Sequence, residues 1–236
     1  LSAAMGFGLN AQLSAGDIVF IQYNADGTDN FAFLALNDIF AGEIIYFTDN
    51  NYNLLTGGEG TITWTSPPSG ISCGTIVTIT TTPSASVGSV TESGDLNFNA
   101  TNGDSIIAYQ GSITTPTFIA GLHNDGFANW GSNLPTGLTN GLNAIAITEI
   151  DNAIYDSSVL SGTSASILAA INNDINWSGD NTNQQIFTDT FTPTDCQSSS
   201  PEIQLVDNTA TNQTCGFTID FGTQVLSSNN DLTFDI

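Results

Sequence analysis

The chain has 236 residues, among them 23 acidic residues, one histidine and no lysine or arginine, and its formal net charge is −23. Such a surface repels the phosphates of nucleic acids and the headgroups of anionic membranes, so both are excluded as partners. The 40% of hydrophobic residues is enough to bury a core, and no apolar run reaches the roughly 18 residues of a membrane span.

The N-terminal segment, residues 1–11, has the sequence LSAAMGFGLNA and is apolar, uncharged and rich in small residues. It is typical of the rear half of a secretory signal peptide, with cleavage after Ala11. The alternative is an ordered apolar strand that pairs with its own domain or with a neighbouring subunit. Both interpretations stay open, and the first indicates secretion.

Short β-type runs follow, separated by turns rich in Gly, Asn, Asp and Pro. Their enrichment in β-branched and aromatic residues predicts strands. The runs are 17–23, 31–36, 43–48, 60–65, 74–82, 104–110, 117–122 and 143–148. Many short strands at this spacing favour an all-β sandwich. One short helix is predicted over 163–174, with Ser164 or Ser166 as its N-cap.

A domain boundary is predicted at the Ser-rich linker 197–201. Residues 12–196 then form the β-sandwich, and residues 202–236 contain the opening strands of a second, immunoglobulin-like β-domain. These few strands cannot close a sandwich alone. We therefore expect that the second domain either continues beyond residue 236 or is completed by another chain.

The three cysteines, Cys73, Cys196 and Cys215, contain no C-x-x-C pair, and a single histidine cannot complete a zinc site with them. One disulfide is expected in a secreted protein. We favour Cys73 with Cys196 because both lie in one predicted domain. Cys196 with Cys215, or three unpaired thiols, are the alternatives.

Acidic and amide side chains are dense in two loops, NADGTDN (24–30) and TDNNYN (48–53). Calcium takes several oxygen ligands from such residues, and the chain has no basic side chain to neutralise the carboxylates. The predicted Ca²⁺ ligands are Asp26, Asp29, Asp49 and Glu59. Asx turns explain the same residues without a metal, and neither loop matches an EF-hand.

Catalysis has little support in the sequence. A Ser–His–Asp arrangement would have to use His123, and no G-x-S-x-G nucleophile elbow occurs. His123 is therefore interpreted as a loop histidine with a local hydrogen bond. Asp49 and Glu59 form a glycosidase-like pair only by the chance that an acid-rich chain provides. We predict that the chain is not an enzyme.

Aromatic residues offer a possible sugar-binding platform. Trp64 alternates with Ile62 in a predicted strand, so we expect it to be buried. Trp130 lies in the Gly-rich stretch DGFANWGSN (125–133), where we expect its side chain to be exposed. Phe127 and Trp130 are the candidate polysaccharide-binding residues.

Six stretches between residues 14 and 196 resemble the N-terminal, lamin-tail-like β-sandwich modules of secreted Bacteroidota-type cell-surface proteins. They are GDIVFIQYNADGTDNFAFLALNDIFAGEIIYFTDNNYN, GEGTITWT, GTIVTIT, GDSIIAYQGS, TFIAGLHNDGF and LTNGLNAIAI. The later run CGFTIDFGTQVLSSNNDLTFDI resembles the opening of an immunoglobulin-like domain of the choice-of-anchor D type. The resemblance implies a secreted, cell-surface protein exported by type IX secretion, and it implies no particular activity.

We therefore expect a non-catalytic extracellular structural or adhesive module, whose partners are neighbouring domains or identical subunits. In a sharper form, it assembles into a filament by strand exchange through residues 1–11 and the incomplete C-terminal sheet. The alternatives are a calcium-stabilised carbohydrate-binding module and an accessory domain of a secreted hydrolase.

Overall fold

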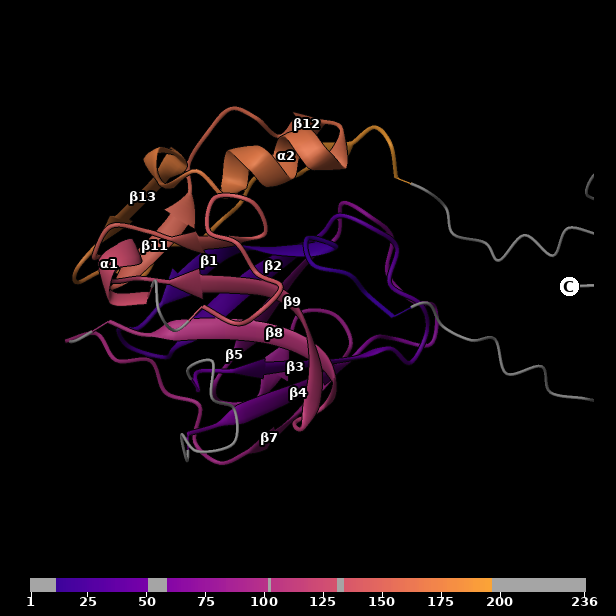
Figure 1. Cartoon of the computed structure of the whole chain (residues 1–236), viewed down its shortest axis with the longest axis horizontal. Coiled ribbons are helices and arrows are strands. Elements are labelled where there is room, and N and C mark those ends of the chain that lie inside the picture. The colour runs from indigo at the N-terminus through magenta and orange to yellow at the C-terminus, as the bar shows by residue number, and fades with distance from the viewer. Residues whose placement is uncertain (1–11, 51–58, 102, 131–133, 197–236) are drawn as a thin grey trace, which may run out of the picture. The chain divides into compact units, whose positions relative to one another are not determined.

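The computed structural model describes residues 12–50, 59–101, 103–130 and 134–196. Two six-stranded sheets, with a helix on the outer face of one of them, confirm the all-β sandwich (Figure 1). The chain divides into two units, residues 1–198 and 199–236, and only the first contains described residues. The predicted leader 1–11 and the partial domain 202–236 lie outside them.

The first sheet, here called sheet A, has the order β13-β11-β1-β2-β5-β6 and is antiparallel throughout. Its strands are β1 (Ile18–Asn24), β2 (Asn30–Ala35), β5 (Ile76–Thr80), β6 (Ser84–Ala85), β11 (Asn152–Tyr155) and β13 (Trp177–Asp180). Strands β1 and β2 are buried along their whole length, because both faces of sheet A are covered at this point.

The second sheet, sheet B, has the order β10-β9-β8-β3-β4-β7, and only its β9–β10 pair is parallel. Its strands are β3 (Ile44–Thr48), β4 (Thr61–Thr65), β7 (Ser89–Ser93), β8 (Ser105–Ser112), β9 (Thr115–His123) and β10 (Ala144–Ala146). The eight predicted runs all contain strands of sheets A and B. Burial alternates along β4, because one face of sheet B meets the core and the other meets solvent.

The predicted helix is α2 (Ser164–Ile171), and it covers the outer face of sheet A with Ile167 and Ile171. Its N-cap is Thr163, not the predicted Ser164 or Ser166: the Thr163 hydroxyl accepts a hydrogen bond from the Ser166 amide at 3.1 Å.

The remaining elements are short: α1 (Gly126–Trp130), the 3₁₀ helix η1 (Asp174–Asn176), and the two-stranded parallel pair β12 (Ser161–Gly162) with β14 (Thr192–Pro193). Within the described ranges, no helix has the length and apolarity to span a membrane.

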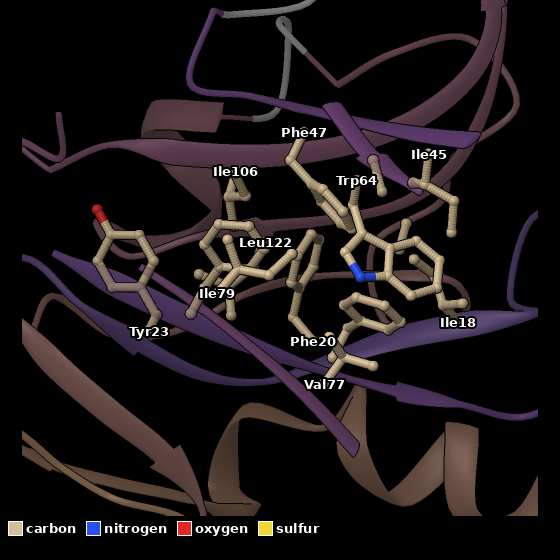
Figure 2. Close-up of a cluster of buried hydrophobic side chains, with 14 of the residues drawn as sticks. Ile18, Phe20, Tyr23, Ile45, Phe47, Trp64, Val77, Ile79, Ile106 and Leu122 are labelled. Atoms are coloured by element: carbon tan, nitrogen blue, oxygen red, sulfur yellow. The ribbon is translucent and has the colours of Figure 1, made fainter. Parts of the chain in front are cut away.

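The core between the two sheets is built around aromatic rings (Figure 2). The rings of Phe33 and Phe47 stack with their centroids 5.4 Å apart, and Trp64 meets Phe33 edge-on at the same distance. Trp64 is fully buried, as the strand pattern predicts, and its indole nitrogen donates to the Val87 carbonyl at 2.7 Å.

A disulfide joins Cys73 and Cys196, which are 123 residues apart in the sequence. This is the pairing favoured from the sequence. It ties the segment that follows β14 to the loop before β5, so the last part of the described chain is fastened to the sandwich. Cys215 lies outside the described residues.

Candidate functional site

Three aspartates border strands at one end of the sandwich. Asp29 immediately precedes β2, Asp49 immediately follows β3, and Asp104 immediately precedes β8. The end of β3 lies beside the start of β8, because the two strands are antiparallel and Thr48 pairs with Ile107. Asp49 and Asp104 are close enough for the charge of the first to raise the pKa of the second.

The segment Leu96–Asn99, between β7 and β8, forms hydrogen bonds with these acids and is here called the amide strap. Each of its four backbone N–H groups donates to a carboxylate. The pairs are Leu96 to Glu92 Oε1 at 3.0 Å, Asn97 to Asp49 Oδ2 at 3.0 Å, Phe98 to Asp29 Oδ2 at 2.7 Å, and Asn99 to Asp104 Oδ2 at 3.1 Å. Consecutive amides thus connect acids that are far apart in the sequence.

Two apolar side chains anchor the amide strap. Leu96 and Phe98 are buried while Asn97 and Asn99 are exposed, the alternation of a strand, although the segment belongs to no sheet. The Phe98 ring lies 4.4 Å from that of Tyr23, centroid to centroid. The strap is therefore held by core packing as well as by its hydrogen bonds.

Glycine at position 60 lets the strap approach the sheet. A Cβ atom added to Gly60 would lie 2.0 Å from the backbone nitrogen of Leu96, far inside contact distance. Gly60 directly precedes β4, so any larger residue here would push the strap away from the strand end.

Burial raises the pKa of all three aspartates. It raises the pKa of Asp29 and of Asp49 to about 6, and that of Asp104 to about 7. The strap amides oppose these rises, because a hydrogen bond to a carboxylate favours its charged form. The charge of Glu59 adds to the rise at Asp49 and Asp104, so this end of the sandwich titrates near neutral pH.

Asp49 is the most enclosed of the three. The residue is 2% exposed. Backbone amides of Asn97, Asp49 and Gly60 favour its charged form, but its Oδ1 atom is buried without a hydrogen bond of normal geometry among the described residues. A buried acceptor without a donor costs free energy, which adds to the cost of burying the charge.

The four predicted calcium ligands do not share one environment in the structure. Asp26 accepts a hydrogen bond from Asn152 Nδ2 at 2.9 Å, Asp29 and Asp49 accept strap amides, and Glu59 is exposed. Within the part of the chain that the structure describes, no three His, Cys, Asp or Glu side chains are grouped to hold a metal ion. Calcium binding by these four residues stays a prediction.

The only histidine, His123, is the last residue of β9 and is buried, whereas the sequence indicated a loop position. Its Nδ1 lies 3.0 Å from Ser105 Oγ, and the two residues are directly opposed on β8 and β9. Burial lowers the pKa of His123. Ser105 is 1% exposed, so a substrate cannot reach it in this structure.

The expectation that Trp130 is exposed was wrong. Helix α1 turns the indole onto sheet B, where it stacks on His123 with ring centroids 5.6 Å apart and is 0% exposed. Gly121 leaves room for the ring, because a Cβ there would lie 2.8 Å from it. Trp130 therefore packs in a small core with Leu138 and cannot form a stacking platform.

The other predicted sugar-binding residue, Phe127, is 52% exposed and borders a groove. The groove lies between α1, β10 and the C-terminal end of α2, and its volume is about 520 Å³. It is described further below as the α1–α2 groove.

The described residues thus define an all-β sandwich whose acidic end is braced by backbone amides. The chain matches no protein-family model, no curated protein and no solved structure at a significant level. Its function is therefore inferred from its own residues.

Proposed function

We propose that residues 12–196 form a non-catalytic structural or adhesive module of a secreted cell-surface protein. One observation carries the proposal: the groups best suited to chemistry are committed to the fold. Asp29, Asp49 and Asp104 accept the amides of the strap, and Ser105 is enclosed with His123. Side chains used in this way act as structural acceptors and not as reactive groups.

The disulfide supports an extracellular location, because disulfides persist in oxidising compartments and are rare in the cytosol of most organisms. The lack of Lys and Arg also leaves trypsin-like proteases without a cleavage site, which suits a protein exposed outside the cell. The resemblance to lamin-tail-like modules supports the same location and export by type IX secretion.

An uncharged face of sheet B supports an adhesive role. The outward side chains of β4 and β7 are threonines and serines that lie in register across the two strands. The pairs are Thr61 with Ser93, Thr63 with Thr91, and Thr65 with Ser89. In a chain of charge −23, such a face lets a neighbouring domain or a second copy approach with little repulsion.

In its sharper form, the proposal is that the chain assembles into a filament by strand exchange through residues 1–11 and the incomplete C-terminal sheet. Sedimentation velocity and electron microscopy of residues 1–236 and 12–236 test this form. Strand donation predicts polymers that disappear on deletion. Monomers from both chains contradict the filament.

The non-catalytic proposal has a separate test. The protein is incubated with ester, phosphate, peptide and polysaccharide substrates, together with the variants Asp104→Asn and His123→Ala. We expect no turnover by any of the three proteins. Turnover that a substitution abolishes, with the variant still folded, would contradict the proposal, because a structural group is not needed for a reaction.

A further inference from the structure

We propose that the α1–α2 groove binds a neutral oligosaccharide. This goes beyond the structural role proposed above, since it assigns a ligand site to the module. The groove's volume of about 520 Å³ lies within the range of small-ligand sites, roughly 300 to 1,000 Å³.

Polar groups on the groove are left available for a ligand. Asn140 uses its Oδ1 to accept from the Ala146 amide at 2.7 Å, and within the described residues its Nδ2 makes no hydrogen bond. Thr148 is exposed in the groove with a hydroxyl that both donates and accepts. Sugar hydroxyls have the same dual character, so amide and hydroxyl side chains are their natural partners.

Asn172, at the end of α2, adds an unpaired acceptor. It lines the groove but is 96% buried, with 4% of its surface exposed. Its Nδ2 donates to the Leu142 carbonyl at 3.0 Å, whereas its Oδ1 is buried without a donor among the described residues. This oxygen is enclosed, so a ligand hydroxyl would satisfy it only after the side chain turns toward the groove.

Apolar side chains are exposed around the groove. Phe127 lines it at 52% exposure, Leu142 is 59% exposed beside Asn172, and Ile175 is 80% exposed next to the lining residue Asp174. Of these three, Phe127 lines the groove, while Leu142 and Ile175 are chain neighbours of the lining residues Gly141 and Asp174. A sugar ring presents C–H groups on its faces and hydroxyls at its edge, and the exposed Phe127 ring suits such a face.

The net negative charge of the chain favours a neutral ligand over an anionic one. The chain has no Lys or Arg, so a phosphate or uronic acid would find no cationic partner and would be repelled by the net charge of −23. A basic ligand would be attracted to carboxylates over the whole surface, and the groove would not select it. A neutral sugar is the class that the polar lining and the exposed Phe127 ring both fit.

Native gel electrophoresis with soluble polysaccharide in the gel tests the proposal. The probes are laminarin, xylan and galactomannan, with alginate as the anionic comparison. We expect at least one neutral polysaccharide to retard the protein and alginate to leave its mobility unchanged. No retardation by the neutral probes, or retardation by alginate, would overturn the proposal.

Variants locate the site. Phe127→Ala should weaken binding about tenfold, from the loss of one aromatic contact, and Phe127→Trp should retain it. Ile186→Ala is the matched control, because Ile186 is also an exposed hydrophobic, at 71%, and does not line the groove. Thermal melts confirm that each variant is folded. Equal retardation of Phe127→Ala and the unaltered protein would contradict the assignment to this groove.

Discussion

Replacing Asp49 with Asn should stabilise the module at alkaline pH and flatten the pH dependence of its stability. Burial raises the pKa of Asp49 from the ordinary 3.8 to about 6, so the folded state binds this proton more tightly than the unfolded chain does. The stability that the protonated carboxyl provides is lost as pH rises through this interval. Above about pH 7 Asp49 is fully ionised, and the full loss of stability has then been reached.

The magnitude follows from the size of the pKa rise. A rise of about two pKa units corresponds to about 3 kcal/mol at pH 8. Asn can still accept from the Asn97 amide, but a hydrogen bond to a neutral acceptor is weaker, and solvent screens part of the burial cost. We therefore expect a net gain of about 1 to 2 kcal/mol, which raises Tm by roughly 3 to 6 °C.

Urea unfolding at pH 4.5, 6 and 8, at constant ionic strength, measures this effect. The charge of Glu59 raises the pKa of Asp49, and the charge of Asp49 raises the pKa of Asp104. Glu59 and Asp104 still titrate in the variant, so only part of the pH dependence of stability disappears. Asp189→Asn is the control, because it removes the same charge from an exposed position. The reasoning fails if Asp49→Asn keeps the full pH slope, or if it is less stable than the unaltered protein at pH 8.

Three further predictions concern the disulfide, the strap and calcium. Cys73→Ser opens a loop of 123 residues and should cost about 4 to 5 kcal/mol in urea unfolding; a loss under about 1 kcal/mol would contradict the loop-entropy estimate. Gly60→Ala should cost about 3 kcal/mol, because its Cβ collides with the Leu96 nitrogen, and unchanged stability would disprove a close strap. Calcium binding predicts a higher Tm in millimolar CaCl₂ than in NaCl of equal ionic strength, and equal values argue against it.

The sheets could be predicted because their strands carry a local signal. Runs such as 17–23 and 60–65 are rich in β-branched and aromatic residues, and both are strands in the structure. Strands β7 (SVTES) and β11 (NAIY) were missed, because one is short on apolar residues and the other has four residues. These two segments form strands because they pair with neighbouring strands, which their own composition does not indicate.

The amide strap could be recognised only in part from the sequence. The alternation of Leu96 and Phe98 with asparagines is visible. Asp49 directly follows the predicted run 43–48, Asp104 begins the run 104–110, and Asp29 lies two residues before the run 31–36. Asp104 was nevertheless missed, although it sits at such a boundary. The strap's partners Asp49 and Asp29 lie 48 and 69 residues away from it, and only the folded chain brings them together.

Trp130 shows why side-chain exposure could not be predicted from its Gly-rich surroundings. The position of its indole depends on a short helix and on Gly121, a residue of β9 without a side chain. The residues next to Trp130 in the sequence do not show whether its ring is exposed or buried. Phe127, three residues earlier in α1, is 52% exposed.

The central claim is that the buried acids act as structural acceptors for the strap, and amide hydrogen exchange tests it most directly. The amides of Leu96, Asn97 and Phe98 belong to no strand, so their protection depends on their carboxylate partners and on core packing. We predict slow exchange, comparable to that of the paired amides in β3 and β4. Exchange as fast as in an exposed loop would contradict the account.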